Sequence, residues 1–230
     1  MRVHVAFTPA EAAAAPVGIV VDVLRATSTI AQALVGGYAR VLCCGEVEEA
    51  RALREELGDG VLAGERKCVR IPGFDRGNSP SEFVEAAGDT VILSTTNGTR
   101  ALLAAATRCD HVLAASLLNL GAVVGAAREA GGDVAIFCAG VKGEFAMDDA
   151  YVAGRLVELL RGEPTDAGVA ALRLSTSFAS AEDGLRSSQS ARNLVAAGLE
   201  EDIAWCARES VLDVVPRYVG MHGSAAEVTA

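Results

Sequence analysis

The sequence is short of histidine, of aromatic residues and of paired cysteines. It has three histidines among 230 residues, and Phe, Trp and Tyr together make up 4%. We expect His4, His111 and His222 to be structural or solvated, so the chain offers little for a histidine-based mechanism. The six cysteines include one adjacent pair but do not show the paired spacing of a zinc site. We interpret them as reduced thiols of a cytoplasmic protein.

Basic side chains and long apolar runs are also scarce. With 20 Lys and Arg against 30 Asp and Glu, the formal net charge is −10, and no clustered basic stripe suits a nucleic acid. The run Ala12–Ala15 is far too short to span a membrane, and Met1–Phe7 alternates like a strand rather than a signal peptide. We therefore expect neither nucleic acid nor a membrane as partner. The hydrophobic content of 51% supports a single domain, residues 1–230.

The motifs of several well-known phosphate enzymes are missing as well. No loop has the lysine spacing of a P-loop, and no strand is followed by the Gly-x-Gly-x-x-Gly of a dinucleotide-binding fold. Cys138 begins a suitable turn for a cysteine phosphatase, but Lys142 and Glu144 stand where its arginine should be. The aspartyl phosphatases need a second Asp two residues after the first, and Leu24 has that place relative to Asp22.

Strand-like and helix-like segments alternate along most of the chain, which predicts a three-layer α/β/α fold with a mainly parallel sheet. The predicted strands are Val3–Phe7, Val17–Val23, Arg40–Cys44, Val61–Ala63, Val91–Ser94, His111–Ala115 and Asp133–Phe137. The predicted helices are Thr27–Val35, Glu46–Leu57, Glu82–Ala87, Thr99–Thr107, Leu118–Ala130 and Asp148–Leu160. From Pro164 onward we expect a helical C-terminal part, and its predicted helices are Asp166–Ser175, Ser187–Ala197 and Glu200–Arg208. The last segment, Gly220–Ala230, is expected to fray.

Two strand-to-helix turns are rich in hydroxyl groups. One follows the strand that ends at Ser94, and we expect its small polar residues to bind an anion at the helix N-terminus: Thr95, Thr96, Asn97, Gly98 and Thr99. The other follows Val17–Val23 and carries Asp22, Arg25, Thr27 and Ser28. Each turn could instead be an ordinary helix cap, with Asp22 as the capping residue. Open α/β sheets, however, bind ligands at the carboxyl ends of their strands.

A third turn supplies acidic residues. After the strand Asp133–Phe137 and a glycine-rich stretch, Asp148 and Asp149 begin a helix. Adjacent acids at a helix start also suit the helix dipole without any ligand. Together with Asp22 they could hold Mg²⁺, which prefers oxygen ligands. The combination of carboxylates, hydroxyls and arginines therefore predicts metal-assisted phosphoryl transfer on a small anionic phosphomonoester.

Several rare motifs occur in order between about residue 18 and residue 155. They are Val21–Ser28, Gly64–Lys67, Gly73–Asp75 with Asn78–Pro80, Thr95–Thr99, and Cys138–Gly140 with Asp148-Asp149. In this combination the chain resembles the 2-phosphosulfolactate phosphatases. The resemblance implies Mg²⁺-dependent hydrolysis of 2-phospho-3-sulfolactate to 3-sulfolactate and phosphate, a step of coenzyme M biosynthesis. One departure is Cys68, where glycine is expected after the Glu-Arg-Lys run.

Such a substrate carries phosphate, carboxylate and sulfonate, and it would need several cations beyond Arg25. Arg66, Lys67, Arg70 and Arg100 are available, and some of them will be ordinary surface charges. The long loop Gly64–Pro80 is expected to face the substrate. Two alternatives stay open: a non-catalytic small-anion-binding protein, and a phosphatase of another small polyanionic ester. The alanine-rich helices would also allow a homodimer.

The part that Asp22 plays has two readings. It could be a ligand to Mg²⁺, or it could be a nucleophile that forms an aspartyl-phosphate. The ligand role is favoured because the second Asp of the aspartyl phosphatases is missing. A water molecule, activated by the metal or a nearby carboxylate, would then attack phosphorus. Asp22 and Arg25 are the predicted catalytic residues.

Overall fold

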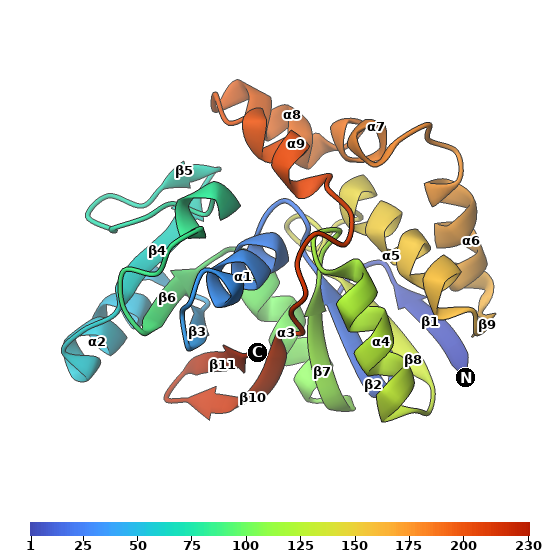
Figure 1. The fold of residues 1–230 in the computed structure, drawn as a ribbon, viewed down its shortest axis with the longest axis horizontal. Coiled ribbons are helices and arrows are strands. Elements are labelled where there is room, and N and C mark those ends of the chain that lie inside the picture. The colour runs from blue at the N-terminus through green and yellow to red at the C-terminus, as the bar shows by residue number, and fades with distance from the viewer.

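One sheet of 11 strands runs through the whole molecule (Figure 1) in the computed structural model, which describes residues 1–230. Its strand order is β5-β4-β6-β3-β11-β10-β7-β2-β8-β1-β9. The strands are β1 (Arg2–Ala6), β2 (Ala15–Val21), β3 (Arg40–Cys44), β4 (Val61–Arg66), β5 (Val69–Arg70), β6 (Thr90–Ser94), β7 (Cys109–Ala115), β8 (Val134–Cys138), β9 (Glu163–Pro164), β10 (Arg217–His222) and β11 (Ala225–Thr229). The three-layer α/β/α fold with a mainly parallel sheet is confirmed.

Nine α-helices and one 3₁₀ helix accompany the sheet. The α-helices are α1 (Ala26–Val35), α2 (Val47–Leu57), α3 (Gly98–Ala106), α4 (Leu120–Ala130), α5 (Met147–Leu160), α6 (Asp166–Ser175), α7 (Ala181–Arg186), α8 (Gln189–Ala196) and α9 (Glu201–Cys206). The 3₁₀ helix is η1 (Pro80–Phe83). No helix combines the length and the apolar character that crossing a membrane requires.

Strand β2 shows why a strand of this sheet could be predicted from a run of apolar residues. It pairs in parallel with β7 on one side and with β8 on the other. Val17, Ile19 and Val21 pack in one apolar cluster with residues of α4 and α5, and Val20 packs in a second cluster with residues of α1 and α3. Because both faces of the strand are covered, nearly every residue in it is apolar.

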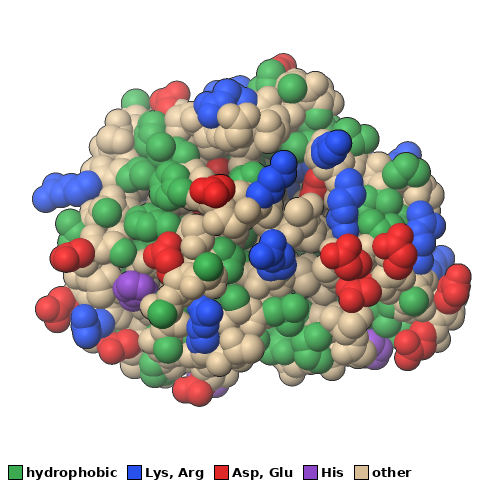
Figure 2. All heavy atoms as spheres, turned by 180° about the vertical axis from the view of Figure 1, so that it is seen from behind, with side chains coloured by type: hydrophobic (Ala, Val, Ile, Leu, Met, Phe, Trp, Pro, Cys, Tyr) green, Lys and Arg blue, Asp and Glu red, His purple; other side chains and the backbone are tan.

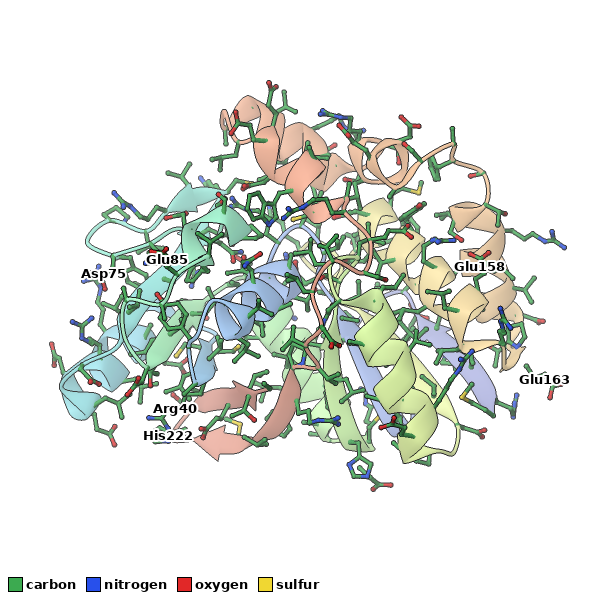
Figure 3. The ribbon with its side chains drawn as sticks, viewed as in Figure 1. Arg40, Asp75, Glu85, Glu158, Glu163 and His222 are labelled. Atoms are coloured by element: carbon green, nitrogen blue, oxygen red, sulfur yellow. The ribbon has the colours of Figure 1, made fainter.

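The C-terminal segment is the largest difference from the prediction. Gly220–Ala230 was expected to fray, and this prediction is wrong: β10 and β11 form an antiparallel hairpin in the middle of the sheet, between β3 and β7. Arg40 of β3 reaches Glu227 of β11 at 3.4 Å, and His222 lies beside the same carboxylate at 3.9 Å (Figure 3). Without this hairpin the predicted strands would form two separate sheets.

The helical C-terminal part also differs in detail. In that part, α7 was not predicted. Earlier in the chain, the predicted helix Glu82–Ala87 is wrong, because only Glu82 and Phe83 belong to the short 3₁₀ helix η1 and residues 84–87 are not helical. The helix Asp166–Ser175 was predicted to the residue. In Figure 1, α7, α8 and α9 lie across the top of the view, above the ends of the central strands. They are therefore placed to cover the carboxyl edge of the sheet, where the candidate site is expected.

Charged side chains of both signs are mixed on the surface. On the face seen in Figure 2, blue Lys and Arg side chains alternate with red Asp and Glu side chains. Because the formal net charge is −10, a region of positive charge exists only where several Lys or Arg side chains lie close together. An anionic ligand needs such a local gathering to overcome the overall repulsion.

Candidate active site

A cavity of about 330 Å³ lies at the carboxyl ends of the strands. The loops after β2, β6 and β8 contribute to it, and so do the β4–β5 hairpin and helix α8. Its walls are formed by Asp22, Leu24, Arg25, Glu65, Arg66, Lys67, Cys68, Asn78, Thr95, Thr96, Asn97, Val141, Lys142, Ser190 and Asn193. Most of these side chains are polar, which suits a small and highly charged ligand.

Asp22 is buried where two helices begin. Its Oδ1 accepts a hydrogen bond from the backbone N–H of Ala26 in the first turn of α1, at 3.3 Å. A Cβ added to Gly98, the first residue of α3, would lie 3.0 Å from Asp22 Oδ2 and 2.6 Å from the Cβ of Ala26. Glycine at this position therefore allows α3 to approach the carboxylate closely. Two helix N-termini meet at Asp22, and both favour negative charge there.

Burial raises the pKa of Asp22 to about 7. The nearby carboxylates of Asp148 and Glu65 contribute to this raised pKa, while the Ala26 N–H and the charge of Arg25 act in the opposite direction. A carboxyl group with such a pKa is only partly ionised at neutral pH, because its surroundings disfavour the negative charge. A bound cation would relieve that charge.

Asp148 and Asp149 are neighbours in the first turn of α5 but have different surroundings. Asp149 accepts two backbone hydrogen bonds, from Val23 N to Oδ1 and from Gly140 N to Oδ2, each at 3.0 Å. It thereby joins the loop after β2 to the loop after β8. Asp148 accepts a hydrogen bond from the hydroxyl of Ser190 at 3.2 Å. Burial raises the pKa of Asp148 to about 6, and it raises the pKa of Asp149 well above the ordinary value.

The three aspartates predicted as metal ligands differ in how well they suit that role. No three His, Cys, Asp or Glu side chains are arranged to hold a metal ion directly. Asp149 does not line the cavity and has both oxygens occupied by backbone N–H groups, so it fits a structural role. Asp22 lines the cavity; Asp148 does not, but it bonds to Ser190, which does, and its charge raises the pKa of Asp22. Two such carboxylates fit Mg²⁺, which commonly uses one or two of them and completes its shell with water and substrate phosphate.

The hydroxyls of the turn after β2 do not line the cavity. Thr27 Oγ1 donates to the carbonyl of Asp22 at 2.9 Å and accepts from the N–H of Asp22 at 3.1 Å. Ser28 Oγ donates to the carbonyl of Val23 at 2.8 Å. Thr29 Oγ1 donates to the carbonyl of Asn78 at 2.9 Å. The hydroxyls of Thr27 and Ser28 hold the backbone around Asp22, and that of Thr29 holds the backbone at Asn78. None of the three hydroxyls is left to bind a phosphate.

The turn after β6 presents its polar groups to the cavity. Thr95, Thr96 and Asn97 line it, and the hydroxyl of Thr95 has no protein partner among the hydrogen bonds of the structure. Thr96 Oγ1 donates to Glu65 Oε1 at 3.3 Å. Asn97 Oδ1 accepts from the N–H of Lys142 at 3.2 Å, which links this turn to the loop after β8. Thr99 bonds instead to the carbonyl of Cys44 and does not reach the cavity.

The basic residues predicted to bind the substrate differ in whether they line the cavity. Arg25 and Arg66 line the cavity. The guanidinium of Arg66, however, already donates hydrogen bonds within the protein, to the carbonyls of Glu65, Gly45 and Ser94 and to the Ser94 hydroxyl. Lys67 lies on the exposed rim. Two further candidates, Arg70 and Arg100, are exposed and do not line the cavity.

Several cavity residues were not predicted from the sequence. They are Glu65, Asn78, Lys142, Ser190 and Asn193. Lys142 belongs to the glycine-rich turn after β8, and its closeness in sequence to Asp148 and Asp149 was a signal that could have been used. Asn78 and Glu65 belong to the long loop that was expected to face the substrate. Ser190 and Asn193 are three residues apart on α8, and nothing local distinguishes them from surface residues.

A buried carboxylate at two helix N-termini, a free hydroxyl beside it and lysines on the rim suit an enzyme that acts on an anionic ester. A family model described as 2-phosphosulpholactate phosphatase matches residues 4–221. A "Probable 2-phosphosulfolactate phosphatase" of Thermus thermophilus is 42% identical over 233 residues, covering 98% of each chain. A protein of Symbiobacterium thermophilum with the same name is 40% identical over 218 residues, covering 90% of this chain and 93% of its own length. The chain belongs to the 2-phosphosulpholactate phosphatase family and is a phosphoric monoester hydrolase.

Proposed function

We propose that this chain hydrolyses 2-phospho-3-sulfolactate to 3-sulfolactate and phosphate, and that it needs Mg²⁺ to do so. The family supports the substrate. The observation that supports the need for Mg²⁺ is the pair Asp22 and Asp148, two buried carboxylates that repel each other. These two would hold Mg²⁺, which supplies charge stabilisation for the phosphoryl oxygens when bound. Both readings of Asp22 require it for turnover, and the ligand role agrees with its position beside Asp148.

The phosphoryl group would bind at the turn after β6. The hydroxyl of Thr95 is free to donate, and the N-terminus of α3 offers unpaired backbone N–H groups and a partial positive charge. Arg25 lies across the same cavity and can donate to a phosphoryl oxygen. Donors would thus approach from two directions, which orients the group for in-line attack.

Hydrolysis moves one proton from the attacking water to the oxygen that leaves phosphorus. Asp22 and Glu65 are the two carboxylates that line the cavity, and with Asp22 assigned to the cation Glu65 is the one that remains. Glu65 Oε1 accepts a hydrogen bond from the hydroxyl of Thr96, and Oε2 accepts one from the N–H of Cys68 at 2.8 Å, so the carboxylate is fixed in orientation on the cavity wall. Its charge also raises the pKa of Asp22. We assign to Glu65 the role of accepting the water's proton. The P–O ester bond breaks as the new P–O bond forms, and the leaving oxygen takes up a proton to give the hydroxyl of sulfolactate.

The other anionic groups of the substrate would face the rim. Lys67 from the β4–β5 hairpin and Lys142 from the loop after β8 both line the cavity, and both are exposed. Neither forms an ion pair with the protein. Their charges are therefore available to the carboxylate and the sulfonate.

The test is phosphate release from purified protein. With 2-phospho-3-sulfolactate and Mg²⁺ we expect turnover, and with excess chelator we expect none. 2-Phospholactate, which lacks the sulfonate, is the matched substrate and should be hydrolysed less efficiently. Undiminished activity in chelator would refute the metal role. Equal efficiency on both esters would refute the sulfonate as part of what is recognised.

A further inference from the structure

The guanidinium of Arg25 is held from two sides by distant parts of the chain. Nη1 donates to Asp202 Oδ2 at 2.6 Å, and Nη2 donates to the carbonyl of Cys68 at 2.9 Å. The side chains of Arg25 and Asp202 are 3% and 6% exposed, so this is a buried ion pair. The two bonds use only part of the donor set of a guanidinium. The remaining N–H groups are available to a ligand in the cavity that Arg25 lines.

Asp202 reaches this place from the far end of the sequence. It lies on α9, 177 residues after Arg25, and its other oxygen, Oδ1, accepts a hydrogen bond from the hydroxyl of Ser79. Ser79 directly precedes η1, the short helix that packs against both α1 and α9. Asp202 itself does not line the cavity that contains Asp22 and Arg25. It can act on a ligand there only through Arg25.

Without Asp202, the nearest strong attraction for Arg25 is a carboxylate in the cavity. The charge of Arg25 already acts on Asp22, whose pKa it lowers. A long and flexible arginine that is free to pair with Asp22 would occupy the space of the cation and of the phosphoryl group. Holding the guanidinium on Asp202 prevents this, and it also fixes the fork of donors before a ligand arrives, which lowers the entropic cost of binding.

We infer that Asp202 is a positioning residue that aims the guanidinium of Arg25 at the phosphoryl group and keeps it away from Asp22. The inference rests on the proposed function. The competing explanation is a purely structural one, in which Asp202 only fastens α9 to the rest of the molecule. Buried ion pairs are weak evidence of stabilisation, because desolvation offsets much of their attraction, so the two explanations need a functional test.

Two variants loosen the same junction in different ways. Asp202→Asn keeps the shape and one acceptor for Arg25 but removes the charge. Ser79→Ala removes the other contact of Asp202 and leaves the ion pair with Arg25. We expect Asp202→Asn to lower kcat by about 100-fold with a smaller change in KM, because a misplaced catalytic group costs about that much. Ser79→Ala should stay within about threefold of wild type. Equal losses of activity in the two variants would overturn the inference.

A double-mutant cycle gives a second readout. In an Arg25→Ala background, adding Asp202→Asn removes an unpaired buried charge, so the melting temperature should recover in part while activity falls no further. A further loss of activity equal to the full effect of the single Asp202 variant would show that Asp202 does not act through Arg25.

Binding of inorganic phosphate, measured by calorimetry in the presence of Mg²⁺, separates the inference from the proposed function. If wild type does not hydrolyse the phosphosulfolactate ester, the proposed function fails. The inference still predicts that Asp202→Asn binds phosphate about tenfold or more weakly than wild type, while Ser79→Ala binds it normally. Unchanged phosphate affinity in Asp202→Asn would refute the positioning role.

Discussion

The turns after β2 and β6 look alike in the sequence and differ in the structure. Each leads from a buried strand through hydroxyl-bearing residues into a helix. After β2, Thr27 and Ser28 lie inside the first turn of α1, and their hydroxyls bond back to the end of the strand. After β6, Thr95 and Thr96 precede the first residue of α3 and line the cavity.

The position of a hydroxyl relative to the helix start explains this difference. A Thr or Ser within the first helical turn is close to the carbonyls that end the preceding strand, and it satisfies them. Thr99 lies inside α3, and its hydroxyl is also used within the protein, here by the carbonyl of Cys44 at the end of the neighbouring strand β3, at 3.2 Å. Of the two hydroxyls before α3, that of Thr96 donates to Glu65 and that of Thr95 stays available. The turn after β2 therefore supplies a fixed charge, Asp22, and the turn after β6 supplies free donors.

The largest expected effect is that of removing this charge. Asp22→Asn keeps the shape of the side chain but loses the charge, so we expect kcat to fall by about 1000-fold or more. The melting temperature should be unchanged or higher, since a buried charge is removed. Activity and melting temperature are measured on the same preparation. An active Asn variant would remove Asp22 from the mechanism, and phosphate trapped covalently on Asp22 in wild type would reverse the choice between ligand and nucleophile.

Removing the free hydroxyl of the other turn should cost less. Thr95→Val keeps the volume of this buried side chain and deletes a donor that has no protein partner. We expect kcat/KM to fall by about 10- to 100-fold with little change in stability, because no hydrogen bond within the protein is lost. Thr99→Val is the matched control, and its kcat/KM should stay within about threefold of wild type. Equal losses of kcat/KM in the two variants would contradict the comparison.

Thr27→Val tests the structural hydroxyls of the turn after β2. It removes a group that both donates to and accepts from the backbone of Asp22, and these backbone groups are buried. We expect the free energy of unfolding to fall by about 1–3 kcal/mol, as measured by urea denaturation. A variant that is as stable as wild type but has lost phosphate binding would mean that Thr27 contacts the ligand directly.

Much of the fold could be predicted because the central strands are covered on both faces. Continuous apolar runs such as β2 then mark each strand. The hairpin β10–β11 could not be predicted in the same way. Its first strand, β10, alternates between exposed and half-buried residues, and the hairpin has its place only in the gap between β3 and β7. The turn Gly223-Ser224 between two short runs was a local hairpin signal that could have been used.

The candidate site was predictable to the extent that it comes from strand ends. Asp22, Asp148 and Thr95 each follow or begin an element whose position in a parallel sheet is known from topology. Ser190 and Asp202 come from α8 and α9, and the sequence does not show how these short helices pack over the sheet. Their contribution depends on long-range packing, which local patterns do not contain.

The dependence of stability on pH offers a smaller effect. Without a cation, the pKa of Asp22 is raised from 3.8 to about 7 and that of Asp148 to about 6, so the folded state holds protons that the unfolded chain releases near pH 4. The stability that this protonation provides is full below about pH 4 and is lost as pH rises towards 7. In chelator the melting temperature should therefore fall across this window, and Mg²⁺ should raise it more at pH 8 than at pH 5. Asp22→Asn should flatten the profile, and a profile as steep as that of wild type would contradict the assignment.

The smallest effect concerns the hairpin that touches both turns. Glu65 accepts from Thr96 of the β6 turn, and the carbonyl of Cys68 accepts from Arg25 of the β2 turn. Lys67 and Cys68 form the two-residue connection between β4 and β5, with φ of 54° and 67°. Both values are typical of a type I′ turn, whose second position favours glycine.

Cys68→Gly should therefore raise the free energy of unfolding by up to about 1 kcal/mol, because the strain of a side chain in the left-handed region is removed. The carbonyl that Arg25 uses belongs to the backbone, so kcat should stay within about twofold of wild type. Cys68→Ala, which keeps a Cβ, is the control and should not gain stability. If Cys68→Gly instead loses activity, the thiol or its Cβ shapes the cavity, and the hairpin contributes to the site through more than its backbone.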